Sequence, residues 1–142
     1  KMVKAMFVSA GVGAVIAENA SIAGASGGCQ AEIGSASAMA AAGLAYLEGG
    51  DAECISHAMA FALKNMLGLT CDPVCGLVEV PCIKRNSAGA VNAISSASAI
   101  TPDEVIDSMR RIGNELPACL KETGEGGLAV TPSALKIKER LN

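Results

Sequence analysis

The chain has 142 residues, a net charge of −3 and a pI near 5.1, and 51% of its residues are apolar although only 2% are aromatic. This length predicts one domain over residues 1–142, large enough to bury most of its apolar surface. The acidic balance and the lack of a long Lys/Arg cluster exclude the electrostatic footprint of a nucleic-acid-binding protein, so no nucleic-acid partner is expected. A core that is poor in aromatic residues and rich in Ala and Gly must gain its contacts from closely packed helices.

The apolar segments do not predict a membrane span, because Glu18 and Asn19 interrupt the first one and residues 33–47 are mostly Ala, Ser and Gly. The N-terminus also lacks the ordered regions of a secretory signal. The six cysteines are therefore expected in a reducing cytoplasm, where metal binding outranks disulfide formation. Lys1 stands in the middle of a helical pattern, so we expect the chain to be a fragment of a longer protein.

The chain begins with an apolar helical pattern over residues 2–17. Gly11 and Gly13 are expected to break this helix, because glycine is a poor helix former. Residues 20–28 contain mostly small side chains and predict a loop or a short irregular helix.

Cys29 follows this segment at a Gly-Gly turn. A helix is expected from about residue 32 to residue 47, ended by Gly49 and Gly50. Cys29 should therefore lie close to a helix N-terminus, where backbone N–H groups and the helix dipole favour a thiolate.

Asp51 is a suitable N-cap for the next helix, which Gly68 should end. The apolar face of that helix is expected to comprise Ile55, Met59, Ala62, Leu63 and Met66.

Two further helices are predicted in the second half of the chain. The first covers about residues 86–100 and should place Val91, Ile94, Ala97 and Ser98 on one face. The second begins after an N-cap at Thr101, in a capping-box pattern, and ends near Leu116. The tail is expected to be a loop with at most a short regular ending. Since no strand series is found, the predicted fold class is all-α, a single compact bundle of Ala/Gly-rich helices with an irregular Cys-containing loop.

That irregular loop covers residues 69–83 and carries half of the cysteines, namely Cys71, Cys75 and Cys82. Three residues in it, Pro73, Gly76 and Pro81, prevent a regular helix. A loop that gathers thiols suggests a metal site, and we expect Cys29 to join it.

Four interpretations of the cysteines remain open from the residues alone. They could be small buried residues, which is our expectation for Cys54 and Cys119. A closed zinc site could use four of them, although only Cys71 and Cys75 have the usual spacing of a zinc pair. A nucleophilic cysteine could act with His57, which has no local signature for this role. An iron-sulfur cluster with one open iron is the fourth, although the spacing differs from the ferredoxin run.

Four longer runs of the chain are distinctive, namely GGCQAEIGSASAMAAAGLAYLEGG (27–50), LGLTCDPVCGLVEVPCIKRN (67–86), AGAVNAI (88–94) and GGLAVTPS (126–133). They resemble the α chain of the iron-sulfur-dependent L-serine dehydratases. The resemblance implies that Cys29, Cys71 and Cys82 hold a 4Fe-4S cluster and that Cys75 is not a ligand. Three thiolates would leave one iron open, as a Lewis acid for the hydroxyl and carboxylate of serine.

The activity that the resemblance implies is deamination of L-serine to pyruvate and ammonia without pyridoxal phosphate, in amino-acid degradation and gluconeogenesis. It also implies an upstream part of the α chain, a β chain or β domain, and an oligomer, so the 142 residues alone should not turn over serine. Some family members end in a cysteine that covers the open iron, whereas this chain ends in KERLN. No residue has a case as the general base. The alternatives are a cysteine desulfidase-like iron-sulfur lyase and a non-catalytic helical interaction or zinc module.

Polar residues near the cysteines have weaker cases for a role. Asp72 and Asn86 could form hydrogen bonds around the ligands or contact substrate, although an Asp before Pro more often serves a turn. Glu32 is expected to be a carboxylate of the first helical turn. Lys84 and Arg85 could neutralise a carboxylate, although the default expectation is a solvated pair.

Overall fold

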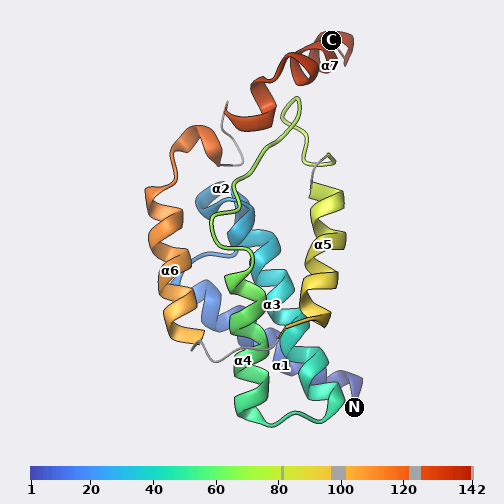
Figure 1. Cartoon of the computed structure of the whole chain (residues 1–142), viewed down its shortest axis with the longest axis vertical. Helices are drawn as coiled ribbons and strands as arrows, with labels where there is room; N and C mark the ends of the chain where they lie inside the picture. Colours follow the sequence, from blue (N-terminus) through green and yellow to red (C-terminus); the bar gives the residue numbers. More distant parts are fainter. Residues whose placement is uncertain (81, 97–101, 122–125, 142) are drawn as a thin grey trace.

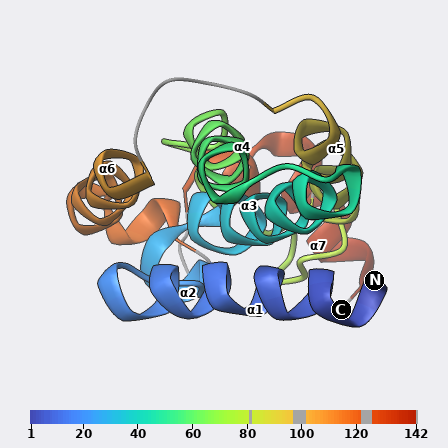
Figure 2. The ribbon, with the colours of Figure 1, turned by 90° about the horizontal axis from the view of Figure 1, so that it is seen from below.

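The computed structural model describes residues 1–80, 82–96, 102–121 and 126–141. The central element is α3 (Cys29–Glu48), which packs against α1 (Met2–Asn19), α4 (Ala52–Lys64) and α5 (Cys82–Ile94). Figure 2 shows α1 as a layer on one side of α3, with α4 and α5 on the other side. The described part is helical and contains no strand beyond one isolated bridge between Val74 and Leu77, which confirms the predicted all-α class.

α1 lies close to α3 because small residues line the contact. A Cβ added to Gly13 would meet the side chain of Met39, and one added to Gly43 would meet Ser9. The Ser9 hydroxyl also donates a hydrogen bond to the Met39 carbonyl at 2.8 Å. The expected break at Gly11 and Gly13 is wrong, since α1 is continuous from Met2 to Asn19. Packing against α3 offsets the weak helix propensity of these glycines.

α3 begins at Cys29, three residues earlier than predicted. A short helix, α2 (Gly24–Gly27), precedes it. Of the two alternatives predicted for residues 20–28, a loop or a short helix, the structure has the short helix. Gly28 separates the two helices with φ +74°, a left-handed value that favours glycine. Gly49 ends α3 in the αL conformation and confirms the predicted C-terminal stop.

α4 has the N-cap that the sequence predicts, since the Asp51 carboxylate accepts a hydrogen bond from the Cys54 backbone N–H at 2.9 Å. The predicted apolar face is correct for Met59, Ala62 and Leu63, which are buried. Met66 is not part of it, because α4 ends at Lys64 and residues 65–68 form a turn. This turn is the first part of the irregular segment between α4 and α5. We call residues 65–80 of this segment the cysteine loop.

α5 starts at Cys82, four residues before the predicted start. No glycine or proline separates Cys82 from Asn86, so nothing in that stretch opposes an early start. The face predicted to carry Val91 and Ile94 points to solvent, since these two residues are 66% and 75% exposed. Gly89 and Ala93 are buried instead. Close approach to α3 requires small side chains at the contact, so the two large ones point away. Ala97, Ser98 and the predicted helix end at Ile100 lie outside the described residues.

Hydrogen bonds join α5 to both neighbouring helices. The Ser37 hydroxyl of α3 donates to the Gly89 carbonyl at 2.8 Å. The side-chain amide of Asn92 donates to Ser37 at 2.9 Å and to the Ala62 carbonyl of α4 at 2.8 Å. These contacts fix the position of α5, and with it that of Cys82 at its start.

α6 (Pro102–Glu115) packs against α4 and α2 and buries Val105, Ile106 and Met109 in the main core. Its predicted N-cap, Thr101, lies outside the described residues. The segment after α6 is more regular than predicted, with the 3-10 turns η1 (Ala118–Leu120) and η2 (Gly127–Val130) and the helix α7 (Pro132–Leu141). Figure 1 shows α7 beyond the end of the bundle, above the tip of the cysteine loop.

Among the described residues, α1 is the one helix whose length and composition would allow it to cross a membrane. Only 22% of the residues in its 18-residue window are buried, and Met2, Val3, Met6 and Phe7 are exposed. Core helices and signal sequences can have the same length and composition, so these two properties do not assign α1 to a membrane.

Candidate metal centre

Three sulfur atoms meet at the end of the bundle where α3 and α5 begin. Cys29 is the first residue of α3, Cys82 is the first residue of α5, and Cys71 lies in the cysteine loop between α4 and α5. Their Sγ atoms all lie within 4.8 Å of one another. All three are buried, since Cys29 is 0%, Cys71 is 1% and Cys82 is 7% exposed. We call Cys29, Cys71 and Cys82 the cysteine trio.

Gln30 holds the loop against the beginning of α3. Its backbone N–H donates to the Leu69 carbonyl at 2.8 Å, and its side-chain oxygen accepts from the Gly68 N–H at 3.0 Å. Its side-chain amide donates to the Met109 carbonyl of α6 at 3.2 Å. This fully buried glutamine therefore connects three segments next to Cys29. These hydrogen bonds hold the start of the loop in place.

The C-terminal segment supports the loop from its other side. The Cys71 backbone N–H donates to the Leu120 carbonyl at 3.0 Å. Gly127, at φ +57°, lies directly against the Asp72 carboxylate, because a Cβ added there would come within 1.9 Å of Asp72 Oδ1. The motif at 126–133 is therefore folded onto the cysteine loop, although some fifty residues separate them in sequence.

Arg85 joins the trio to the loop. One terminal nitrogen donates to Cys29 Sγ at 3.2 Å and to the Thr70 carbonyl at 2.8 Å. The other forms a salt bridge with Asp72 Oδ2 at 3.0 Å, and both side chains are largely buried, at 19% and 11% exposure. The expectation of a solvated Lys84–Arg85 pair is therefore wrong for Arg85, whereas Lys84 is exposed. The α5 helix places Arg85 one turn from Cys82, on the side that faces the loop.

The electrostatic surroundings of the trio are mixed. Burial raises the pKa of the Cys82 thiol, and the neighbouring Cys29 and the negative charge of Glu32 raise it further, while Arg85 opposes them. Burial by itself would lower the pKa of Arg85, but hydrogen bonds to Cys29 and Asp72 outweigh it and the pKa is raised. Arg85 therefore remains a cation beside the sulfurs.

The two helix starts add partial positive charge. Cys29 and Cys82 are the first residues of α3 and α5, where the backbone N–H groups have no partners within the helix. Some of these N–H groups have backbone partners outside the helix, as Gln30 has in Leu69, so the helix starts act on the sulfurs mainly through the partial positive charge of the helix dipole. Two helix dipoles and one guanidinium therefore favour negative charge on the sulfurs once a cation is bound.

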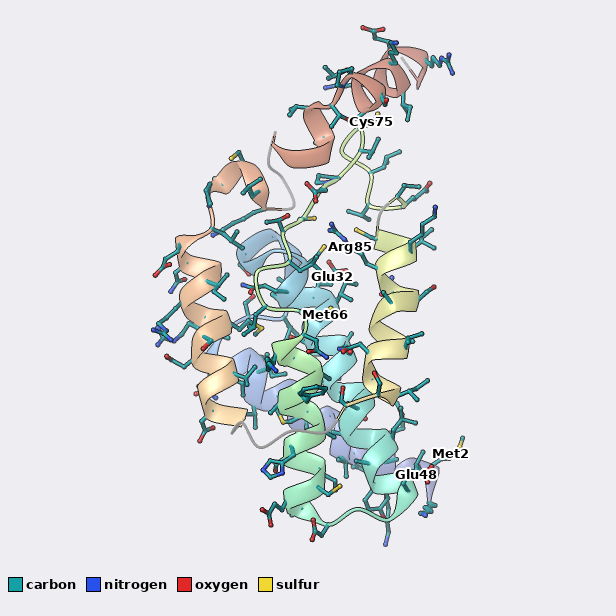
Figure 3. The ribbon with its side chains drawn as sticks, viewed as in Figure 1. Met2, Glu32, Glu48, Met66, Cys75 and Arg85 are labelled. Carbon is teal, nitrogen blue, oxygen red and sulfur yellow. The ribbon has the colours of Figure 1, made fainter. Side chains whose placement is uncertain are left out.

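The other cysteines lie away from the trio. Cys75 is at the tip of the loop, with φ +57°, and its thiol lies 3.7 Å from the Ala134 carbonyl of α7. Figure 3 shows Cys75 at the α7 end of the loop, while Arg85 and Glu32 lie together near the start of α5. Cys54 and Cys119 are exposed, so the expectation that they are small core residues is wrong. Cys54 is in the first turn of α4 and Cys119 is in η1, and neither position faces the core.

Two further candidates have no contact with the sulfurs. Asn86 is exposed and lines a shallow groove between α3 and α5, beside Ile33 and Gly89. His57 is a partly exposed residue of α4, a helix that does not contribute to the trio. Asp72 fits the proposed supporting role, through its salt bridge to Arg85.

The sequence indicated for Arg85 only a possible role in neutralising a carboxylate, and it did not link this residue to the cysteines. The available signal was its spacing of three residues from Cys82, which places both residues on one face if the helix starts early. Because the predicted helix began at residue 86, Arg85 fell in a loop and this periodicity did not apply.

The donor set fits a thiolate-ligated metal centre. Cys29, Cys71 and Cys82 form the one group of three convergent metal-ligating side chains found among the described residues, and it contains no imidazole or carboxylate. Thiolates suit soft or borderline metals, including zinc and iron-sulfur clusters. Three protein ligands are one fewer than a closed tetrahedral or cubane site uses, so one metal position would stay open to a further ligand.

The family model described as "Serine dehydratase alpha chain" matches residues 1–129. A Bacillus subtilis (strain 168) protein named "Probable L-serine dehydratase, alpha chain" is 52% identical over 149 residues, which cover 99% of this chain and 50% of that protein. "L-serine dehydratase, alpha chain" of Peptoniphilus asaccharolyticus is 48% identical over 138 residues, covering 92% of this chain and 47% of its own length. "L-serine dehydratase 1" of Escherichia coli (strain K12) is 46% identical over 134 residues, 87% of this chain and 30% of that protein. The chain thus spans about half the length of the first two relatives.

Proposed function

Because this chain belongs to the serine dehydratase alpha chain family, we propose that it carries the metal centre of an L-serine ammonia-lyase that releases pyruvate and ammonia. The observation that supports this proposal is the convergence of three buried sulfurs from separate segments. We assign Cys29, Cys71 and Cys82 as the ligands of a 4Fe-4S cluster, with Cys75 outside the ligand set. No pyridoxal phosphate is required in this proposal.

When bound, the cluster supplies a Lewis acid that makes the serine hydroxyl a better leaving group. The residues of this chain bind and shield that centre. Cys29 and Cys82 present their sulfurs at the positive ends of α3 and α5, and Arg85 adds a third source of positive charge. With Cys29, Cys71 and Cys82 as the three protein ligands, one metal position would be free to accept substrate oxygens. The general base that takes the α-proton is not assigned to any residue of this chain.

We propose that the whole enzyme needs more than these residues. The relatives described above are longer than the region they share with this chain, and two of them are named as alpha chains. A β chain or β domain, the remainder of the α chain and an oligomeric assembly are parts of the proposal, with L-serine as the substrate. The 142 residues alone should therefore bind the cluster without turning over serine. A reducing compartment such as the cytoplasm would keep the thiols competent to bind metal.

The spacing of the sulfurs also favours a second candidate, a site for a single zinc ion. Tetrahedral thiolates with Zn–S bonds of about 2.3 Å lie about 3.8 Å apart, which is compatible with three sulfurs within 4.8 Å of one another. A four-iron cube would hold the thiolates farther apart, so Cys71 in its irregular loop would have to move outward. Zinc binding would make the trio a structural element of a helical module.

Metal analysis after anaerobic reconstitution distinguishes the two candidates. We expect about four iron and four sulfide per chain, with broad visible absorption. Cys29→Ser, Cys71→Ser and Cys82→Ser should each abolish this absorption, because each removes a ligand. Cys75→Ser, Cys54→Ser and Cys119→Ser are the matched controls and should retain it. Zinc without sulfide would favour the structural site, and a cluster that survives all three trio substitutions would refute the ligand assignment.

A further inference from the structure

Arg85 is a cation that donates a hydrogen bond to a sulfur of the cysteine trio, that of Cys29. The same guanidinium donates to the Thr70 carbonyl and to Asp72, the two residues on either side of Cys71. A single side chain on α5 therefore contacts the ligand residue of α3 and both sequence neighbours of the ligand in the loop. Nothing in the family-level assignment gives this arginine a role.

We propose that Arg85 is a positioning residue for the metal centre, which sets the place and the charge of the Cys29 sulfur. Asp72 holds the guanidinium in the required orientation. This inference rests on the proposed function, since it concerns the cluster that the trio would hold. Arg85 would act through Cys29 rather than by binding substrate.

The shape of the side chain explains why an arginine serves here. Its planar guanidinium presents donors in fixed directions, so one nitrogen can bond Cys29 and Thr70 while the other bonds Asp72. A lysine offers one compact ammonium and cannot reach three acceptors in the same geometry. Both charged side chains are largely buried, which weakens solvent screening of their attraction.

Asp72 is itself fixed, and this limits the movement of Arg85. Gly127 packs directly against its carboxylate, and Thr70 Oγ1 donates to it at 3.4 Å. A series of contacts from Gly127 to Asp72, Arg85 and Cys29 therefore connects the C-terminal segment to the first residue of α3. Hydrogen bonds of this kind to a ligand sulfur reduce its negative charge, which stabilises the reduced cluster and raises its reduction potential.

The test uses the 142-residue chain after anaerobic reconstitution. Arg85→Gln removes both the positive charge and the planar set of guanidinium donors, whereas Arg85→Lys retains only the charge. Lys84→Gln is the matched control at the exposed neighbour. The measurements are the reduction potential followed by electron paramagnetic resonance and the rate at which a chelator removes iron. A residue that only stabilises the fold would change the melting temperature and leave the potential unchanged.

We expect Arg85→Gln to lower the reduction potential and to accelerate iron loss about 10- to 100-fold. Arg85→Lys should fall between Arg85→Gln and the unaltered chain, and it replaces Arg85→Gln in every comparison if the latter does not fold. The double variant Asp72→Ala/Arg85→Gln should have the same reduction potential and rate of iron loss as Arg85→Gln alone, because Asp72 acts through the arginine.

The outcomes separate this inference from the proposed function. If the unaltered chain assembles the cluster and both Arg85 variants match Lys84→Gln in potential and iron loss, the positioning role is wrong and the proposed function stands. If the unaltered chain assembles no cluster, both are wrong. Additive effects of Asp72→Ala and Arg85→Gln would overturn the role of Asp72 as the anchor of Arg85.

Discussion

Gly127 shows how a single residue far from the cysteines can determine the local geometry of the metal centre. It has φ +57°, and a Cβ at this position would meet Asp72 Oδ1 at 1.9 Å. Any side chain there must displace the carboxylate that binds Arg85. The site therefore depends on a backbone position in the C-terminal segment.

Gly127→Ala should lower the free energy of unfolding by about 2–3 kcal/mol, because it combines left-handed backbone strain with a steric clash. Gly68→Ala is the matched control, since Gly68 has φ +80° but no atom within 4 Å of an added Cβ. The control should lose only about 1 kcal/mol from strain. Urea denaturation of both variants measures the difference. Equal losses in the free energy of unfolding would show that the contact with Asp72 does not contribute to stability.

For single residues, the sequence indicated which residue types could bind a metal, but it did not indicate which side chains contact one another. That Cys29 joins the loop cysteines could be predicted from the turn residues around them, whereas the choice of Cys71 and Cys82 without Cys75 rested on the family resemblance. The contacts of Arg85 could not, because they depend on the side of the loop that α5 faces. The exposure of Cys54 and Cys119 was missed, since a cysteine by itself does not indicate its depth.

Among the elements, the contact between α3 and α5 is the most sensitive to side-chain size. Gly89 lies against Ile33 of α3, and a Cβ there would come within 3.0 Å of Ile33 Cγ2. Ile33 also packs against the cysteine trio. A larger residue at position 89 should push α5 away from α3 and move Cys82 with it.

Gly89→Leu should therefore destabilise the fold by about 1–3 kcal/mol through overpacking. Gly11→Leu is the same change on an open helix surface, because no atom lies within 4 Å of an added Cβ at Gly11. It should stabilise the protein by up to about 1 kcal/mol, since leucine is the better helix former. Thermal denaturation followed by circular dichroism tests both, and a stabilised Gly89→Leu variant would show that the contact tolerates expansion.

For the whole molecule, metal binding is expected to connect three segments that the chain brings together without covalent links. Cys29, Cys71 and Cys82 belong to α3, the cysteine loop and α5, and no cysteine forms a disulfide, all six being within the described residues. A ligand that binds only the folded state adds about 2.7 kcal/mol at 100 times its dissociation constant. The centre should therefore contribute to stability as well as to chemistry.

We expect the reconstituted chain to melt about 5–10 °C above the metal-free chain. A chelator should remove this increase. Cys82→Ser should lack the increase, while Cys75→Ser should retain it because Cys75 lies at the loop tip near α7. Differential scanning calorimetry under anaerobic conditions makes the comparison. An equal melting temperature with and without metal would mean that the metal does not bind the folded chain in preference to the unfolded chain, and the expected stabilisation would be wrong.

The sequence by itself determined the helical class, the N-cap at Asp51, the C-terminal stop at Gly49 and the family, because local propensities and motif residues carry this information. Only the tertiary structure decided that α5 turns Gly89 inward and Val91 outward, and that Arg85 reaches Cys29. These features depend on how closely α3 and α5 approach and on the path of the C-terminal segment over the loop. Packing between distant segments selects among local alternatives of similar energy, so local sequence patterns could not decide them.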